Sequence, residues 1–202
     1  MEELKQTHLN DEISLNWGRL IQGDRCALEA IYRKHAGELL QFGCSLINDP
    51  EFVKDCLQDV FVDLWKYHST LQSTDNIKLY LFKCLSNRIY KGNKEESKRR
   101  VISKDHAMQQ DHFLDSVETH LININTEESV KIKLSIALEE LPMRQKEVLN
   151  CLFFEQFTYE ETSRLMNINL RSVYTLAWKA ITSLKREIGQ PIIILILSSI
   201  YN

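Results

Sequence analysis

Hydrophobic residues recur at steps of three and four along most of the chain, which is the spacing of one buried face of an α-helix. In the first half this pattern predicts helices over about residues 11–22, 25–47, 50–67 and 76–100. The third of these helices has its hydrophobic stripe at Val53, Cys56, Leu57, Val60, Phe61 and Leu64. No segment of any length shows the strict alternation expected of a β-strand. The pattern therefore predicts an all-α fold.

Capping residues and polar segments mark the ends of these helices. Asp24 and Asp49 stand directly before predicted helices, where a carboxylate can accept hydrogen bonds from the free N–H groups of the first turn. Pro50 suits a first helical position, because it has no N–H to leave unpaired. Residues 68–75 are polar and predict a loop between the third and fourth helices.

The middle of the chain differs from both halves. Residues 101–125 lose the helical periodicity and gain acidic residues and asparagine, which predicts a flexible acidic linker. Helices resume near Thr126, and Pro142 opens a further helix. We therefore expect two small helical domains, at 11–100 and 126–189, joined by this linker.

Residues 158–187 have the pattern of a helix-turn-helix. Thr158 and Glu161 form a capping box, in which each side chain can bond the backbone N–H of the other residue. The helix that they start ends at Met166, and residues 167–169 form a short turn in which asparagine tolerates a left-handed conformation. Asn169 can cap the second helix, and Ile168 is expected to fill the core. The predicted buried face of the second helix consists of Leu170, Val173, Ala177, Ile181, Leu184 and Ile188.

The opposite face of this second helix is polar, aromatic and basic. Near its beginning it presents Arg171, Ser172, Tyr174, Thr175, Trp178 and Lys179. A recognition helix uses such residues, because side chains near its N-terminus reach base edges in the major groove and flanking cations bind phosphates. A helical hairpin with a solvated face has the same spacing, so the motif alone leaves both interpretations open.

The distribution of charge also suggests contact with a polyanion, although the net charge is only −3. Nine Lys or Arg residues lie within 78–104, and five lie within 164–186, where no acidic residue occurs. Six acidic residues and no Lys or Arg lie within 105–128. Two basic segments separated by an acidic one favour two contact surfaces for nucleic acid, and the alternative is two solvated faces.

Other features limit the class of function. The five Cys residues include no close pair and predict buried thiols in a reducing compartment. The first sixteen residues are polar and acidic, so we expect no signal peptide and a cytoplasmic protein. The hydrophobic run within 190–202 is too short to span a bilayer and is expected to pack on the protein or on a partner. We expect no cofactor and no metal, since His106, His112 and His120 do not share a helical face with the aspartates near them.

Two sets of residues resemble one family. Leu138–Val148 (LEELPMRQKEV) and Phe157–Asn169 (FTYEETSRLMNIN) are similar to region 4 of bacterial sigma factors. Asp55–Trp65 (DCLQDVFVDLW) and Tyr80–Arg88 (YLFKCLSNR) are similar to regions 2.2 and 2.3 of the same proteins. Their order and spacing over residues 15–188 resemble the extracytoplasmic-function group, which has regions 2 and 4 only.

The resemblance implies binding to core RNA polymerase and to promoter DNA, without enzymatic activity or a small-molecule substrate. The region 2.2 helix would dock on the β′ coiled coil through Asp55, Gln58, Asp59 and Trp65, with Trp65 as a buried anchor. Region 4 would contact the β flap, and an anti-sigma factor is a candidate partner. The alternative for these four residues is a solvated helix with a core tryptophan.

The same resemblance implies that residues 76–91 open the −10 element of the promoter. One stripe of this helix, at steps of three or four, consists of Tyr80, Lys83, Asn87 and Lys91. Asn87 would bond a base edge, and the loop at 68–75 would capture a base flipped out of the stack. The helix-turn-helix would bind the −35 element through the six residues of its polar face.

The sequence departs from the family pattern at three positions. Many members carry Trp where Tyr80 stands, and Lys or Arg where Tyr174 and Leu176 stand. The recognition helix is therefore less basic than usual, which favours apolar contacts and shape readout. A helix-turn-helix activator that is not a polymerase subunit is the alternative within DNA binding, and a helical enzyme is the alternative outside it. The activator would carry a strand-containing regulatory domain at its N-terminus, which the pattern does not predict.

Overall fold

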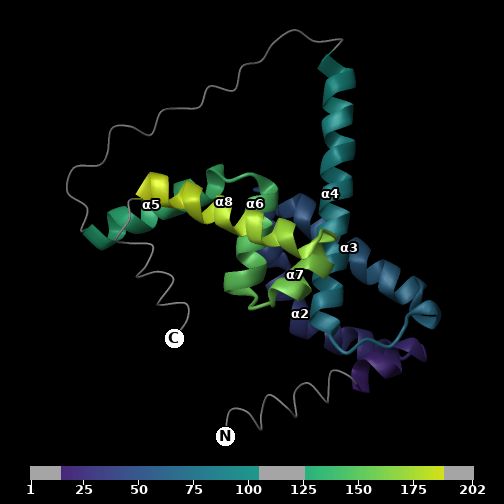
Figure 1. Cartoon of the computed structure of the whole chain (residues 1–202). Coiled ribbons are helices and arrows are strands. Elements are labelled where there is room, and N and C mark those ends of the chain that lie inside the picture. Colours follow the sequence, from purple (N-terminus) through teal and green to yellow (C-terminus); the bar gives the residue numbers. More distant parts are fainter. Residues whose placement is uncertain (1–14, 105–125, 189–202) are drawn as a thin grey trace, which may run out of the picture. The chain divides into compact units, whose positions relative to one another are not determined.

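The computed structural model describes residues 15–104 and 126–188 (Figure 1). The chain divides into two compact units, one mainly N-terminal and one mainly C-terminal. Side chains are described for 15–95 and 132–186. Within these ranges all regular structure is helical, so the predicted all-α fold is confirmed. A helix at 15–21 is followed in the N-terminal unit by α2 (Arg25–Leu46), α3 (Pro50–Lys66), the short 3-10 helix η1 (His68–Thr70) and α4 (Ile77–Lys104). The C-terminal unit contains α5 (Thr126–Glu140), α6 (Met143–Leu149), the π-helix η2 (Asn150–Phe154), α7 (Tyr159–Met166) and α8 (Leu170–Ile188).

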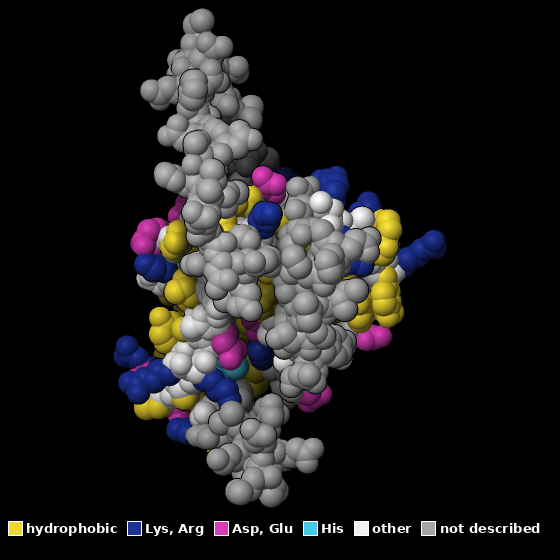
Figure 2. Space-filling view, turned by 90° about the vertical axis from the view of Figure 1, so that its left-hand side faces the viewer, with side chains coloured by type: hydrophobic (Ala, Val, Ile, Leu, Met, Phe, Trp, Pro, Cys, Tyr) yellow, Lys and Arg dark blue, Asp and Glu magenta, His cyan; other side chains and the backbone are white. Residues whose placement is uncertain are grey.

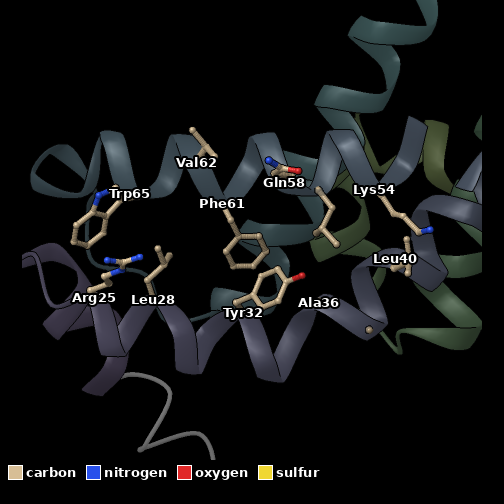
Figure 3. Close-up of a pocket in the computed structure, with 12 residues that line it drawn as sticks. Arg25, Leu28, Tyr32, Ala36, Leu40, Lys54, Gln58, Phe61, Val62 and Trp65 are labelled. Atoms are coloured by element: carbon tan, nitrogen blue, oxygen red, sulfur yellow. The ribbon is translucent and has the colours of Figure 1, made fainter. Parts of the chain in front are cut away.

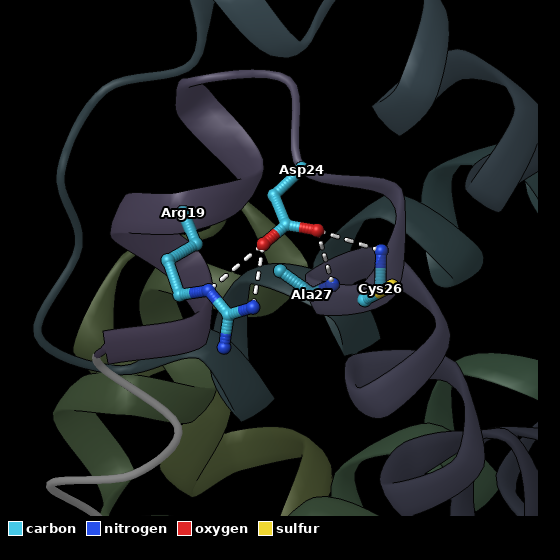
Figure 4. Close-up of polar contacts among 4 residues, drawn as sticks. All are labelled: Arg19, Asp24, Cys26 and Ala27. Carbon is cyan, nitrogen blue, oxygen red and sulfur yellow. Dashed lines mark hydrogen bonds and ion pairs between the residues drawn. The ribbon is translucent and has the colours of Figure 1, made fainter.

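The predicted caps define the starts of α2 and α3. The Asp24 carboxylate accepts hydrogen bonds from the backbone N–H groups of Cys26 at 2.8 Å and Ala27 at 3.4 Å. It also pairs with the Arg19 guanidinium, which ties α2 to the preceding helix (Figure 4). The Arg19 hydrogen bond lowers the pKa of Asp24, although burial opposes this shift. At α3, the Asp49 side chain accepts from the N–H of Phe52 at 3.0 Å, as predicted.

The core of the N-terminal unit forms where α2, α3 and α4 meet. All six residues of the predicted α3 stripe are buried. Phe42 of α2 packs on Phe82 of α4 with ring centroids 4.9 Å apart. Gly43 allows the helices to approach closely, because a Cβ atom there would lie 2.4 Å from Val53 Cγ1 and 3.3 Å from Ile89 Cδ1. A methyl group at this position would overpack the junction.

Helix α4 extends further than predicted. It continues to Lys104, four residues beyond the expected end at Arg100 and into the segment assigned to the linker. The sequence 94–104 contains no Gly or Pro to stop a helix, and its lysines, glutamates and arginines are good helix formers. The rest of the predicted linker, 105–125, and the tail, 190–202, lie outside the described residues.

In the C-terminal unit, α5 and α6 pack against α8. The core there consists of Ala137, Leu141, Leu149, Ala180 and Leu184, with Leu134, Leu138, Phe153 and Ile181 packed against it. The hydrophobic spacing also places Ile132 and Ile136 on the stripe of the helix that begins near Thr126, but both are exposed, at 38% and 46%. Leu170 of the predicted α8 stripe is exposed as well, at 36%. The prediction that Leu170 belongs to the buried face of α8 is therefore wrong, because this residue lies in the exposed first turn of the helix.

The π-helix η2 was not predicted. It widens the backbone over Asn150–Phe154 and buries Cys151 while leaving Phe154 59% exposed. Gln156 then takes a positive φ of 58°, and the chain turns into the helix-turn-helix. Among the described residues, no helix is long and hydrophobic enough to cross a membrane.

Candidate nucleic-acid and protein interfaces

The helix-turn-helix forms with the local bonds that the sequence predicts. The N–H of Glu161 donates to Thr158 Oγ1 at 3.1 Å, and the N–H of Thr158 donates to Glu161 Oε2 at 2.9 Å, which completes the capping box. In the turn, Asn167 has a φ of 52°, the left-handed conformation expected there. Asn169 Oδ1 accepts from the N–H of Ser172 at 2.8 Å and caps α8. Ile168 is half-buried.

The outer face of α8 is aromatic, with few cations. Trp178 is 67% exposed and Tyr174, one turn earlier, is 51% exposed. Arg171, Thr175 and Lys179 are exposed, and Ser172 is half-buried. The Thr175 hydroxyl donates to the carbonyl oxygen of Arg171 at 2.9 Å, so this donor is engaged within the helix. The six predicted residues therefore share the exposed side of α8, with its two aromatic rings as the largest groups.

Tyr174 is held by a residue that the sequence reasoning missed. Tyr159, the first residue of α7, stacks on it with ring centroids 4.2 Å apart and planes 15° apart. This contact joins the two helices of the motif on the outer side and fixes the orientation of a ring assigned to DNA. A tyrosine directly after the capping Thr158 is visible in the sequence, but its partner fifteen residues later is not.

Three of the four residues assigned to the −10 element line one cavity. A cavity of about 390 Å³ lies between α3 and α4, and Tyr80, Asn87 and Lys91 form part of its wall. Asn87 and Lys91 are exposed and Tyr80 is half-buried. The fourth predicted residue, Lys83, is half-buried and is not part of this wall. The remaining lining residues are Val60, Asp63, Leu64, Tyr67, Leu71, Cys84 and Arg88.

Tyr80 is set firmly into the wall of this cavity. Its ring meets the indole of Trp17 edge to face, with centroids 5.2 Å apart. Burial, with the neighbouring Cys84 as a smaller cause, raises the pKa of Tyr80 to about 12, so the phenol stays protonated and keeps a hydroxyl for hydrogen bonding. Burial likewise raises the pKa of Cys84, which makes this thiol a poor nucleophile.

Several of the nine Lys and Arg residues in the basic segment at 78–104 are engaged in contacts within the protein. Arg88 forms ion pairs with Asp63 and, at 3.6 Å, with Asp59. Lys78 lies over the ring of Phe82 and pairs with Glu38 at 3.5 Å. On the face shown in Figure 2, basic side chains stand among acidic and hydrophobic ones. Because several cations are engaged in structure, the DNA-binding interpretation of this segment depends on its remaining residues.

A hydrophobic groove runs between α2 and α3 (Figure 3). It has a volume of about 900 Å³. Tyr32 of α2 and Phe61 of α3 meet edge to face in it, with centroids 5.0 Å apart. At one end Trp65 lies opposite Arg25 and Leu28 of α2 (Figure 3). The exposed side chains along it include Val62 at 54% and Tyr32 at 46%. Such an open hydrophobic surface on a small domain is typical of a protein-binding site.

The four residues assigned to polymerase docking separate into two groups. Gln58 and Trp65 line the groove, whereas Asp55 and Asp59 do not. Trp65 is 38% exposed and stacks on His68, with ring centroids 5.2 Å apart. The alternative that Trp65 is an ordinary core residue is therefore wrong. Asp59 pairs with Arg88, which gives this carboxylate a structural partner within the chain.

No group of three or more potential metal ligands occurs among the described side chains. The histidines considered as ligands, His106, His112 and His120, lie outside the described residues. Cys56 is buried, and burial raises the pKa of its thiol to about 11. Cys151 is buried as well, and burial raises the pKa of its thiol well above the usual value. Cys56 and Cys151 are therefore buried as the sequence predicts, whereas Cys26 is exposed and Cys44 and Cys84 are half-buried, so the prediction of buried thiols is wrong for Cys26.

The chain is similar to known sigma factors in sequence and in structure. Residues 132–184 match the family described as sigma-70, region 4. The ECF RNA polymerase sigma factor SigM of Bacillus subtilis (strain 168) is 23% identical over 158 residues, which cover 78% of this chain and 93% of that protein. The chain also matches solved structures in fold.

One such structure is the sigma factor RpoE in complex with the anti-sigma factor NepR from Bartonella quintana. It matches with a TM-score of 0.58 and 17% identity, over 81% of this chain and 97% of that one. Another is CnrH in complex with the cytosolic domain of CnrY, with a TM-score of 0.56 and 14% identity, over 86% and 94% of the two chains. At these identities the structures support the fold alone.

The helix-turn-helix, the region 4 match and the similarity to SigM over most of both chains lead to one conclusion. The chain belongs to the extracytoplasmic-function group of sigma-70 factors, the non-enzymatic transcription initiation factors that direct RNA polymerase to promoters.

Proposed function

We propose that this sigma factor divides its contacts among three surfaces: a polymerase-docking groove, a −10 face and a −35 face. The observation that carries the proposal is that one chain has two different surfaces suited to nucleic acid. One is a cavity lined by Tyr80 and Asn87, and the other is a capped recognition helix bearing Tyr174 and Trp178. A simple DNA-binding activator needs the second surface only.

The groove between α2 and α3 is proposed to hold core polymerase. Its floor is hydrophobic, and the half-exposed indole of Trp65 at one end can be buried by a partner. Buried aromatic anchors of this type account for much of the binding energy at protein interfaces. Gln58 on the same wall adds a polar group, and Asp55 and Asp59 of the same helix extend the surface with charge. We assign the β′ coiled coil to this surface, and the β flap to the C-terminal unit.

The cavity between α3 and α4 is proposed to receive unstacked bases of the −10 element. The Tyr80 ring and the Asn87 amide meet the two needs of such a base, which are a stacking surface and hydrogen bonds to its polar edge. Lys91 on the same wall can bind the strand's phosphates. Lys83, which lies off this wall, is proposed to contact the backbone outside the cavity.

The outer face of α8 is proposed to bind the −35 element as duplex. Arg171 and Lys179 are its exposed cations, while Tyr174 and Trp178 offer flat hydrophobic surfaces for sugars and thymine methyl groups. With few cations, this unit alone should bind DNA weakly. Its contribution grows when polymerase holds both promoter contacts at once.

An anti-sigma factor is proposed as a further partner. One similar solved structure is a complex of the sigma factor RpoE with the anti-sigma factor NepR, and another is a complex of CnrH with the cytosolic domain of CnrY. The exposed hydrophobic groove is the described surface best suited to a helix of such a protein. The chain is proposed to act in the cytoplasm, where its polymerase is found.

The test is binding to core polymerase followed by run-off transcription on genomic fragments. The wild-type chain should bind the polymerase and start transcripts at defined sites. Trp65→Ala should weaken polymerase binding at least tenfold, in the range seen for aromatic anchors. Leu15→Ala shortens a hydrophobic side chain that is 63% exposed in the same unit but does not line the groove, and it should bind like wild type. Wild-type protein that fails to bind polymerase, or equal losses in both variants, would contradict the assignment.

A further inference from the structure

Trp17 links the two elements assigned to the −10 promoter element, and no motif in the sequence drew attention to it. It lies in the helix at 15–21 and is 2% exposed. Its indole Nε1–H donates to the backbone carbonyl oxygen of Gln72 at 3.0 Å, across 55 positions of sequence. Its ring also meets Tyr80 edge to face at 5.2 Å. One buried side chain therefore contacts both the loop and the DNA-facing wall of α4.

The bonded carbonyl lies in the part of the loop with the least local structure. The 3-10 helix η1 ends at Thr70, and the N–H of Leu71 closes back onto His68 at 3.2 Å. At the other end, the N–H of Asn76 donates to the Thr74 hydroxyl at 3.3 Å. Gln72 lies between these two turns, and its side chain is exposed. The bond from Trp17 thus fixes the backbone at the midpoint of the segment.

The contact of Trp17 with Tyr80 affects the wall of the cavity between α3 and α4. An edge-to-face pair restricts the tilt of both rings. Tyr80 is half-buried in the cavity wall, so a change in its tilt changes the surface on which a base would stack. Trp17 is too buried to touch DNA itself. Its influence on the promoter must act through Gln72 and Tyr80.

We propose that Trp17 is a positioning residue for −10 recognition: it holds the 68–75 loop and the Tyr80 ring in the arrangement that receives unstacked bases. This inference rests on the proposed role of the α3–α4 cavity. When a loop is in its binding-competent arrangement only part of the time, its apparent affinity falls in proportion to the fraction of time spent in that arrangement. Loss of one ordinary hydrogen bond should lower the affinity for single-stranded −10 DNA roughly two- to tenfold.

The informative variant is Trp17→Phe, which keeps an aromatic ring but removes the N–H donor. A matched control is Ile31→Val, which trims a buried side chain of α2 in the same unit. Both variants lose some packing, but the first alone loses the loop bond. The full chain is assembled with core polymerase and tested against a single-stranded oligonucleotide carrying the non-template −10 sequence of a promoter mapped by run-off. Hydrogen exchange of residues 68–75 and binding of the −35 duplex are measured on the same samples.

Trp17→Phe should weaken oligonucleotide binding two- to tenfold and speed amide exchange in the loop, with polymerase binding and −35 binding unchanged. Ile31→Val should leave loop exchange and oligonucleotide binding at wild-type values. Equal behaviour of the two variants would overturn the inference and leave Trp17 as a core residue. If the wild-type holoenzyme itself fails to bind the oligonucleotide, the proposed −10 function fails instead.

A measurement on the wild type covers the case in which Trp17→Phe does not fold. Hydrogen exchange of the wild-type holoenzyme is compared with and without the oligonucleotide. Because Trp17 couples the two segments, bound DNA should increase protection of residues 15–21 together with that of 68–75. Protection of the loop without any change in 15–21 would contradict a positioning role.

Discussion

The two proposed DNA-binding faces are built in different ways. On α4, Tyr80 is half-buried and packed against Trp17, Arg88 beside it is held by two aspartates, and Asn87 lies at the edge of a cavity. On α8, Trp178 is 67% exposed, and Tyr174 rests on a single neighbouring ring. The first face is packed into the body of its unit, and the second is more exposed.

This difference suits the two proposed tasks. Holding unstacked bases requires a pocket of fixed shape, because the strand has lost its own stacking and must find replacement contacts. Binding a duplex requires a convex helix that follows the major groove, and small adjustments of exposed side chains cost little. We therefore expect substitutions at the α4 face to act on promoter opening, and substitutions at the α8 face to act on duplex affinity.

The largest effect is expected for Asn87→Ala. Removal of the amide takes away a base-edge contact, which is worth about 1–3 kcal/mol. Promoter opening, measured by permanganate reactivity of the −10 region in the holoenzyme, should fall by the corresponding factor. Binding of the −35 duplex should not change. Because Asn87 is exposed on a helix, alanine should not disturb the fold.

Gln41→Ala is the matched control, since it removes another exposed amide from a helix of the same unit. It should open promoters like wild type. Normal opening by Asn87→Ala would refute the assignment of the α4 face to the −10 element.

The sequence predicted the parts of each face that depend on local bonds. The caps made by Thr158 and Asn169 and the left-handed turn at Asn167 form as expected, because capping and turn chemistry act within a few residues. Exposure of Leu170 was not predicted, since periodicity shows that residues share a face but not how far the neighbouring helix extends.

The supporting contacts of both faces were also missed. Trp17 meets Gln72 and Tyr80, and Tyr159 meets Tyr174, across separations that no local pattern encodes. Lys83 shows that local spacing can also assign a residue to a site that it does not line. It has the correct helical spacing for the −10 stripe but does not line the cavity, because the walls of a cavity depend on the second helix as well.

A smaller effect is expected for the stacked pair on the α8 face. Tyr159→Ala should leave the Tyr174 ring free to rotate and should weaken −35 duplex binding by about 0.5–1.5 kcal/mol, the value of an aromatic pair. Tyr159→Phe keeps the stacking surface and should bind like wild type. Duplex affinity of the holoenzyme at fixed salt is the measurement. Equal affinities for the alanine and phenylalanine variants would show that Tyr174 needs no support.

The two units also differ in the polar groups that they bury without hydrogen-bond partners. In the C-terminal unit, Thr162 of α7 is fully buried and its hydroxyl has no hydrogen-bond partner. Thr162→Val replaces the hydroxyl with a methyl group of similar size and should stabilise this unit by about 1 kcal/mol. Hydrogen exchange of α7 and α8 amides in the full chain should slow accordingly. Thr162→Ser keeps the hydroxyl, loses a methyl group and should destabilise; faster exchange in the valine variant would contradict the argument.

In the N-terminal unit the corresponding group is His35, which is 4% exposed and faces Glu38, Lys34 and Lys78. Burial lowers the pKa of His35, and Glu38 only partly offsets this effect. The folded state therefore binds a proton less readily than the unfolded state, so stability is full above the unfolded pKa of 6.5 and is lost as the pH falls toward the folded pKa. The loss should reach at most about 1 kcal/mol at pH 6.

The measurement is denaturant-induced unfolding of the full chain between pH 8 and 6. Unfolding is monitored by hydrogen exchange of α2 and α4 amides, with rates corrected for intrinsic exchange. His35→Leu removes the titrating group and should flatten the pH dependence of these helices, while α7 and α8, which contain no histidine, serve as the internal reference. An unchanged pH dependence in this variant would assign the effect to another group. A flattened one would show that the fixed framework beneath the −10 face is held in part by a histidine that must stay neutral.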